Sequence, residues 1–401
     1  MPFRRSWNEI LPVLTNGISY GHVTFILPNG EQCQFGSELD GQPRISITIR
    51  NMTAFLDSLL VCRPVSLMEA AIRGGLEFDP SFEAAVPVLF ANAEGVLEAY
   101  KQLKPGLVGG LFRHIHRLFV AEPKRTMWLS KVWSDEAQKF FDIGSSIWHE
   151  KINEGSGFSC GRFNSDDDTL MQAKINNFDY IIEKLQITAD HHVLDLGCGN
   201  GFFCIYVSQK TGCKATGFDI VKDVIENGNK QAKENGLEDR VKLFVQDAMK
   251  SLPGQYDAVV SIEVICGVDK PNRIKFLQNI EKVLKPQGKV FIQTLAMAKG
   301  LLPIYGQIST SLSGVEAFDP DEPEAILPPG FKQISEESIG HHLVKSDKKM
   351  LANWKKLEPE LIAENKYWLE NLKFIYYFIR SFTPCYESNY IDHKQYAFQK
   401  I

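Results

Sequence analysis

The stretch that decides the fold is HVLDLGCGNG, residues 192–201. Two apolar residues, Val193 and Leu194, lead into Asp195. A loop with three glycines follows, at Gly197, Gly199 and Gly201. Glycine allows a sharp backbone turn and a close ligand approach, and a helix expected over Phe202–Gln209 would point its N-terminal amides at that ligand. The stretch therefore predicts a nucleotide-like cofactor at the carboxyl end of a parallel strand, where open α/β sheets bind ligands.

The spacing of the glycines distinguishes between cofactors. A dinucleotide-binding loop has the pattern G-x-G-x-x-G, which seats a pyrophosphate on the helix N-terminus. Here Gly201 comes one residue early, and Phe202 occupies the usual glycine position. Asp195 would also repel a pyrophosphate, whereas it suits the cationic amino-acid end of S-adenosylmethionine. The loop therefore favours S-adenosylmethionine, although a glycine loop by itself can be no more than a tight strand-to-helix turn.

Acidic residues follow the next strands along the chain. Asp219 closes the expected strand 214–219, 24 residues after Asp195, where an acid that binds ribose hydroxyls belongs. Asp247 follows the expected strand 241–245 and precedes Ala248, which places this pair to bind the adenine amino group. Glu263 in turn follows the expected strand 256–262. Acids at successive strand ends make the tight-turn alternative unattractive.

The series of strands and acids resembles the class I S-adenosylmethionine-dependent methyltransferases. The resemblance runs from Ile182 to Leu295 and includes an expected helix over Asn272–Leu284, a turn at Lys285–Gly288 (KPQG) and a strand over Lys289–Thr294. It implies an α/β fold: a Rossmann-like, mostly parallel sheet with helices on both faces.

Composition is compatible with this interpretation. The chain has 401 residues, of which 44% are hydrophobic and 23% charged, and its net charge of −5 gives no indication of nucleic-acid binding. The N-terminus lacks the pattern of a signal peptide, and no apolar run is long enough to span a membrane. Eight scattered cysteines without metal-ligand spacing indicate reduced thiols, no metal site and a cytoplasmic protein.

The chain divides into three expected parts. Residues 1–100 show hairpin signals, with an Asn-Gly turn at Asn29-Gly30 and strict alternation over Arg44–Arg50, and predict a small α+β domain, either lipid-binding or a plain scaffold. Residues 101–135 form a connector whose amphipathic segment Leu107–Val120 is either an interdomain helix, which we favour, or a peripheral membrane contact. Residues 136–401 form the catalytic domain, in which we expect 296–346 to be irregular and to cover the active site.

A second resemblance lies upstream of the cofactor loop. Phe140–Trp148 resembles the HYDxGNDFY segment of the cyclopropane-fatty-acyl-phospholipid synthases, Phe158–Phe163 resembles their YSCAYF segment, and Ser66–Gly75 resembles a glycine-acid segment of their N-terminal domain. The resemblance spans nearly the whole chain. It implies that Phe158 and Ser159 help to bind the cofactor.

The same resemblance implies a catalytic base and also a departure from it. The family holds a bicarbonate with a Cys, a Glu, a His and a Tyr. Here the Cys is present as Cys160, but the Glu position is Cys266, followed by Gly267, the His position is Gln293, and the best match to the Tyr is His342. An anion without these partners would be costly in an apolar site. We therefore expect no bicarbonate-dependent ring closure of the usual kind, and a protein base in its place: His342, the adjacent His341, or Glu263.

The resulting prediction is an S-adenosylmethionine-dependent C-methyltransferase that acts on an unsaturated, lipid-linked acyl chain and gives a methylated, methylene or cyclopropane product. One alternative is a methyltransferase of an amine or another small metabolite. Another is a catalytically silent lipid-binding relative. S-adenosylhomocysteine would be the by-product, contact with a membrane surface is compatible with the sequence, and a homodimer stays open.

Overall fold

The computed structural model describes residues 17–36, 41–51, 71, 74–92, 95, 151–155, 157, 159–297, 317–318, 326–364, 379–380 and 382–401. The chain falls into two compact units. The larger unit takes in Ala137–Leu301, Val315–Pro359 and Asn389–Ile401, and the smaller takes in Met1–Glu136, Leu302–Gly314 and Glu360–Ser388. The structure thus groups Glu360–Ser388 with the N-terminal part of the chain, not with the catalytic domain to which the sequence assigned it.

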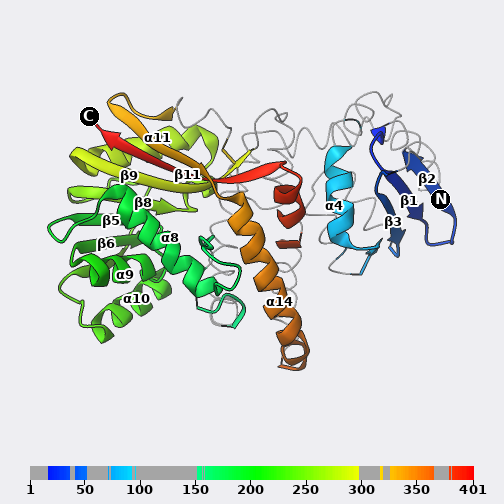
Figure 1. The fold of residues 1–401 in the computed structure, drawn as a ribbon, viewed down its shortest axis with the longest axis horizontal. Helices are drawn as coiled ribbons and strands as arrows, with labels where there is room; N and C mark the ends of the chain where they lie inside the picture. The colour runs from blue at the N-terminus through cyan, green and yellow to red at the C-terminus, as the bar shows by residue number, and fades with distance from the viewer. Residues whose placement is uncertain are drawn as a thin grey trace. The chain divides into compact units, whose positions relative to one another are not determined.

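The larger unit is built on a seven-stranded sheet of order β10-β11-β9-β8-β5-β6-β7 (Figure 1). Its strands are β5 (His192–Leu196), β6 (Lys214–Asp219), β7 (Val241–Val245), β8 (Tyr256–Ile262), β9 (Leu284–Met297), β10 (Phe331–Ser338) and β11 (Ile391–Lys400). The five strands from β7 to β9 in this order are parallel, and β11 inserts antiparallel between β9 and β10. The expected mostly parallel α/β sheet is confirmed, and β6 and β7 have the predicted bounds.

Alternating apolar residues let helices cover both faces of this sheet. Val193 of β5 belongs to a buried cluster shared with α8 (Leu170–Leu185), α9 (Phe202–Thr211) and α10 (Lys222–Glu234). The next residue, Leu194, belongs to a second cluster, which is shared with α11 (Lys270–Val283). Because successive side chains of a strand point to opposite faces, this assignment places α11 on the face opposite to the other three helices.

Two sequence-based boundaries in this unit were wrong. The Lys285–Gly288 segment does not precede the strand but lies within β9, where the pairing with β8 jumps from Leu284 opposite Tyr256 to Lys289 opposite Ala258. The jump loops the segment out without ending the strand. Region 296–346, expected to be irregular, contains β10 and the start of α14 (Gly340–Glu364) in its described part. The β10 pairing with β11 overrides the polar composition of that region.

The smaller unit contains a four-stranded sheet of order β2-β1-β3-β4. Its elements are β1 (His22–Ile26), β2 (Gln32–Gly36), β3 (Arg44–Ile49), β4 (Leu76–Asp79) and α4 (Phe82–Ala91). The predicted Asn-Gly turn joins β1 and β2, and alternate residues of β3 are buried in an apolar cluster with α4. Arg380 pairs with Glu83 of α4, which ties the late segment to this unit. Some parts of the chain that the sequence analysis singled out lie outside the described residues: segments 107–120 and 140–148, and Phe158.

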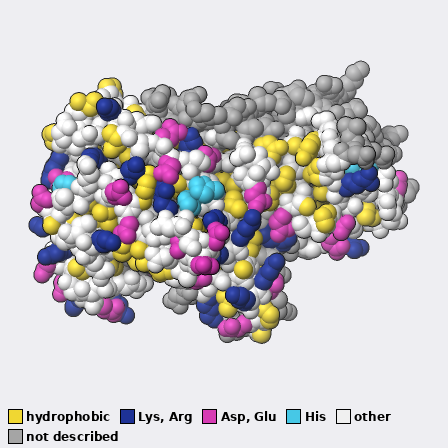
Figure 2. All heavy atoms as spheres, viewed as in Figure 1, with side chains coloured by type: hydrophobic (Ala, Val, Ile, Leu, Met, Phe, Trp, Pro, Cys, Tyr) yellow, Lys and Arg dark blue, Asp and Glu magenta, His cyan; other side chains and the backbone are white. Residues whose placement is uncertain are grey.

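The surface of the larger unit carries both signs of charge. On the face shown in Figure 2, Lys and Arg side chains are interspersed with Asp and Glu. Ion pairs such as Lys222–Glu226 and Lys210–Asp179 belong to this surface and are largely exposed, so each contributes little to stability. Within the described ranges, no helix combines the length and the apolar character that a membrane crossing needs.

Gly228 of α10 allows the helix to lie directly against the glycine loop. A Cβ added at Gly228 would lie 2.4 Å from the backbone oxygen of Asn200. We predict that Gly228→Ala weakens S-adenosylmethionine binding roughly tenfold, or about 1.4 kcal/mol, although alanine is the better helix former. Isothermal calorimetry measures the effect. Asn227→Ala, at the neighbouring exposed position of the same helix, is the control and should bind normally; equal affinity of the two variants would contradict the prediction.

Candidate active site

The glycine loop and Asp219 form one hydrogen-bonded unit. The Asp219 carboxylate accepts hydrogen bonds from the Gly199 amide at 3.0 Å and from the Val221 amide at 2.9 Å. Gly197 and Gly201 both have a φ of +74°, which favours glycine. A Cβ at Gly197 would also collide with the side chain of Val264. The loop therefore needs glycine at these positions, and it packs directly against the residue that follows Glu263.

Asp195 is a buried carboxylate with little to neutralise it. Its side chain lies in the sheet with the residue 4% exposed, and its hydrogen-bond partner among the described residues is the weak Cys204 thiol at 3.9 Å. Burial, followed by the charge of Asp219, raises the pKa of Asp195 to about 7. A carboxylate in this condition is stabilised by a bound cation. The site thus fits the ammonium group of S-adenosylmethionine.

The edge strand β7 and its neighbour β6 supply surfaces that fit the rest of this cofactor. Ile220, next to Asp219, is 58% exposed, and Phe244 of β7 is 51% exposed. Large apolar side chains at the carboxyl ends of strands suit a flat adenine ring. Asp247 accepts a hydrogen bond from the Met249 amide at 2.8 Å, and Ala248 packs beside it against the α11 side of the core. Their assignment to adenine stays a prediction.

The segment around Cys160 is held by a buried lysine. Lys174 of α8 is 2% exposed and donates hydrogen bonds to the Ser159 hydroxyl and the Ser159 carbonyl oxygen. Desolvation lowers the pKa of Lys174 to about 8, against the opposing attraction of Glu263. The Cys160 thiol is buried, and burial raises its pKa well above the usual value, so it is not a nucleophile. The segment instead contributes its backbone to the site.

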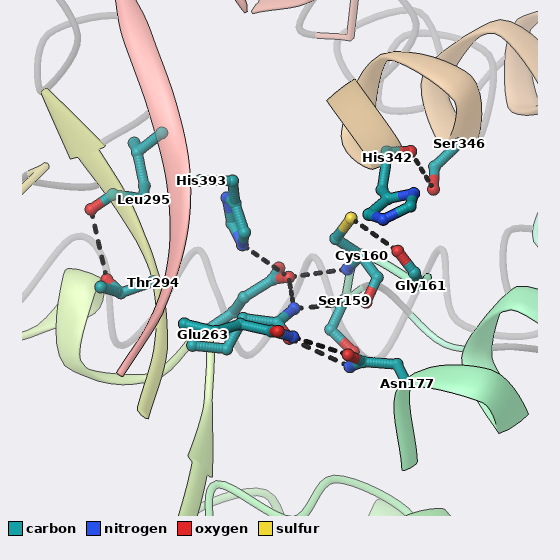
Figure 3. Close-up of polar contacts among 12 residues, drawn as sticks. Ser159, Cys160, Gly161, Asn177, Glu263, Thr294, Leu295, His342, Ser346 and His393 are labelled. Atoms are coloured by element: carbon teal, nitrogen blue, oxygen red, sulfur yellow. Dashed lines mark hydrogen bonds and ion pairs between the residues drawn. The ribbon is translucent and has the colours of Figure 1, made fainter. Parts of the chain in front are cut away.

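Glu263 is the centre of the polar cluster in Figure 3. Its Oε1 accepts three hydrogen bonds: from the Cys160 amide at 2.6 Å, from Gln293 Nε2 at 2.9 Å and from His393 Nε2 at 3.1 Å. The other oxygen, Oε2, accepts none from the described residues, and the side chain is 23% exposed. Glu263 is thus anchored through one oxygen, while the other carries no hydrogen bond from the described residues and the side chain keeps some exposure.

The backbone and the ionisation of Glu263 are both unusual. Its φ is +59°, in the left-handed region where a non-glycine residue costs on the order of 1–3 kcal/mol. Desolvation raises the pKa of this carboxyl, but His393, Lys174 and the Cys160 amide together outweigh it and hold the pKa below its usual value. The carboxylate is therefore ionised at neutral pH despite its surroundings, which is the state that a base requires.

The histidine pair lies beside this cluster and not in it. His341 and His342 are in the first turn of α14, not in a loop as expected, because Ile339 caps that turn through its carbonyl oxygen. His342 is 7% exposed and accepts a hydrogen bond from the Phe163 amide through Nδ1 at 3.1 Å. Burial, followed by the neighbouring His341, lowers the pKa of His342 to about 4. No contact between His342 and Glu263 is present in the described structure, so His342 holds the 160–163 segment from its other side.

The structure thus brings together Cys160, Glu263 and Gln293. It also places Cys266 near Glu263, and the pKa of the Cys266 thiol is raised to about 11, first by burial and then by the Glu263 carboxylate. Sequence reasoning missed His393, which is 4% exposed on β11. A signal was present: the polar run His393-Lys394-Gln395 comes directly before the apolar residues Tyr396-Ala397-Phe398 of the same strand. Only the pairing of β11 with β9 shows that two of these side chains meet Gln293 and Glu263.

The residues present do not fit a bound bicarbonate. The donors of Cys160, Gln293 and His393 all end on a protein carboxylate. A second anion at this place would need these donors, which Glu263 Oε1 already occupies, so its charge would be left poorly compensated. The protein base stays a prediction, which this arrangement of Glu263 supports.

Comparison with known proteins places the chain in a family. The family model described as mycolic acid cyclopropane synthetase matches residues 130–375. The chain is 24% identical over 310 residues to the cyclopropane-fatty-acyl-phospholipid synthase of Escherichia coli, covering 77% of this chain and 74% of that protein. It is 26% identical over 204 residues to a probable fatty acid methyltransferase of Pseudomonas putida, covering 45% of this chain and 52% of that protein.

A similar fold is found among solved structures. The cyclopropane synthase MmaA2 of Mycobacterium tuberculosis superposes with a TM-score of 0.59 at 17% identity, covering 65% of this chain and 95% of that one. The fold and the family together define a class, the S-adenosylmethionine-dependent methyltransferases, with S-adenosylmethionine as the methyl donor. Within this class, the chain belongs to the mycolic acid cyclopropane synthetase family. It spans about half the length of some curated relatives, including the Pseudomonas protein.

The raised pKa of Asp195 predicts a pH dependence of cofactor binding. Because the folded pKa of about 7 lies above the usual value, Asp195 loses its proton only as the pH rises through 7, and only the ionised form attracts an ammonium group. Affinity for S-adenosylmethionine should therefore rise about tenfold from pH 6 to 7.5, before the cofactor's own amino group, with a pKa near ~7.7–8.0, loses its charge. Calorimetry at several pH values tests this. Asp195→Asn should bind weakly with a flat profile, and a flat profile in the wild type would contradict the assignment.

Proposed function

We propose that this protein is a C-methyltransferase that acts on unsaturated fatty acyl chains. Relatives named as fatty acid methyltransferase and cyclopropane-fatty-acyl-phospholipid synthase support the substrate class. The observation that carries the proposal is the partly exposed Glu263 carboxylate, which is anchored through Oε1 and lies one residue from the Val264 side chain that packs against the cofactor loop. A base at this place is what alkene methylation requires.

The chemistry assigns a task to each part of the site. S-adenosylmethionine supplies an electrophilic methyl group, and the loop of Gly197–Gly201 with Asp195 and Asp219 would hold it. The alkene π electrons form the new C–C bond to the methyl carbon as the S–CH₃ bond breaks, and a carbocation develops on the neighbouring alkene carbon. Glu263 Oε2 then accepts a proton from the alkylated chain, and the electrons of that C–H bond neutralise the cation. Closure onto the added carbon gives a cyclopropane, and other proton losses give a methylated or methylene alkene.

Neighbouring residues set the orientation and the charge of the Glu263 carboxylate for this task. Three N–H donors on Oε1 hold the carboxylate in one orientation, so that its basic oxygen has a defined direction. Lys174 and His393 favour the charged form, which also stabilises a carbocation electrostatically. Cys160 acts through its amide and not through its thiol.

A second candidate function follows from the same carboxylate. An ionised Glu263 beside the cofactor loop could bind the ammonium group of an amine substrate and accept its proton. This is the small-metabolite methyltransferase alternative. It differs from the acyl proposal in product and not in cofactor.

Product analysis separates these functions. In cells expressing the protein, mass spectrometry of lipids should show a gain of one CH₂ on unsaturated chains. Unchanged lipids together with a methylated amine pool would favour the second candidate. Absence of S-adenosylmethionine binding in calorimetry would contradict both.

Glu263→Gln tests the assigned base. The amide keeps the shape but cannot accept the proton, so lipid methylation should fall by roughly 10²–10⁴-fold, while the Kd for S-adenosylmethionine changes less than about threefold. Glu238→Gln, an exposed carboxylate on the loop before β7, is the matched control and should be fully active. Full activity of Glu263→Gln would refute the role of this residue.

A further inference from the structure

Three amide side chains connect Glu263 to a distant arginine. They come from α8, β9 and β11 and are each no more than 1% exposed: Asn177, Gln293 and Gln395. Gln293 and Gln395 are directly opposite each other in the β9–β11 pairing. At the far end of this amide chain lies Arg162, whose position in the YSCAYF-like segment is a tyrosine in the resembled family.

The amide chain has a fixed direction because its two ends differ chemically. Arg162 Nη2 donates to Gln395 Oε1 at 2.7 Å, and a guanidinium can only donate. Gln395 must therefore turn its Nε2 the other way, where it donates to Gln293 Oε1 at 2.8 Å. Gln293 in turn presents Nε2 to Glu263 Oε1 at 2.9 Å. Each amide orientation follows from the one before it.

Gln293 has no hydrogen-bonding capacity left over. Its Oε1 accepts from Gln395 and from Asn177 Nδ2, the latter at 3.0 Å. Its Nε2 donates to the Cys160 carbonyl at 3.2 Å and to Glu263. A reversed amide would set its oxygen against these two acceptors and its nitrogen against two donors. Such mismatches are costly in a buried site, so the orientation of Gln293 is fixed, and its oxygen keeps both donors only while Gln395 presents Nε2 to it.

Arg162 is itself held firmly. Its guanidinium makes two hydrogen bonds to the Glu337 carboxylate, at 2.9 and 3.1 Å, and lies 3.7 Å from the centre of the Tyr180 ring. The Tyr180 hydroxyl donates to the same carboxylate at 2.6 Å. Glu337 neutralises most of the charge of Arg162. The arginine therefore acts on the amide chain mainly through its geometry as a donor and not through a long-range field.

We propose that Arg162 is a positioning residue for the reaction: it holds Gln395 in the orientation that keeps Gln293 firmly in place as a donor to Glu263. This proposal rests on the proposed role of Glu263 as the base. Without the donor of Arg162, Gln395 can reverse, and its oxygen then faces two acceptors, Gln293 Oε1 and Asn177 Oδ1. Gln293 then loses a donor on its oxygen and is held less firmly, so its hydrogen bond to Glu263 weakens. A weaker bond to the carboxylate favours the protonated acid, which cannot accept a proton from the substrate.

Other groups also face Glu263: His393 on β11, Lys174 on α8, Cys160 in the 159–161 segment and Cys266 after β8. Of these, Cys160 also accepts a hydrogen bond from Gln293 through its carbonyl oxygen. A midpoint shift shared by Arg162→Met and by Gln395→Leu, which changes no residue of the 159–163 segment, therefore reports on the amides.

Infrared spectroscopy tests the proposal on the full chain without an activity assay. The carboxylate band that is lost in Glu263→Gln identifies Glu263, and a pH titration of this band gives its midpoint. Arg162→Met should raise the midpoint by about one pH unit, because a hydrogen bond to the charged form is lost. Gln395→Leu breaks the amide chain one step closer to Glu263 and should raise the midpoint by a similar amount. The double variant with Arg162→Met and Gln395→Leu should raise the midpoint little further. Arg162→Lys, whose side chain still only donates hydrogen bonds, should keep the midpoint close to the wild-type value.

Two controls separate the outcomes. Glu337→Gln removes the charge partner of Arg162 but leaves the hydrogen bond to Gln395, so the midpoint should stay unchanged or fall. Unchanged midpoints in Gln395→Leu and in Arg162→Met would overturn the proposal. If Arg162→Met does not fold, an unchanged midpoint in Gln395→Leu is enough to overturn it. A wild-type protein that methylates no lipid would contradict the proposed function, while the titration would still decide the role of Arg162.

Discussion

The structure of the site depends on one constraint, a partly buried carboxylate that must stay charged. Glu263 meets it by placing three N–H donors on Oε1, from the 159–161 segment, β9 and β11. His393, Lys174 and the Cys160 amide offset desolvation, which would otherwise raise the pKa of Glu263. The strained backbone at Glu263 is tolerated because these contacts and the packing of Val264 on the cofactor loop fix the residue from several sides.

This arrangement explains how the donor and acceptor halves of the reaction meet. The cofactor loop ends β5, Glu263 ends the adjacent parallel strand β8, and Gln293 lies on β9 next to it. The antiparallel insertion of β11 then brings His393 and Gln395 to the same place. A sheet of this order therefore brings the predicted methyl donor site and the proposed base to neighbouring strands, although their residues are far apart in the sequence.

The sequence predicted the strands, the fold class and the cofactor of the donor half, because that half is local. The strand, the glycine loop and the acid at Asp219 depend on short-range rules of backbone freedom and strand ends, and the structure gives β6 and β7 the expected bounds. The base half depends on long-range pairing. The register of β11 against β9 is what brings His393 and Gln395 to the site, and no local pattern specifies that register. The same limit explains the histidine pair, whose residue type suggested a base but whose helix placed it behind the 160–163 segment.

The central claim is that a protein carboxylate replaces the bicarbonate implied by the family resemblance. The most direct measurement is the rate of lipid methylation in buffer freed of dissolved CO₂, with and without added bicarbonate. The account predicts the same turnover in both conditions, because Glu263 already occupies the donors that would hold the anion. A large loss of turnover without bicarbonate, restored when it is added, would contradict the account.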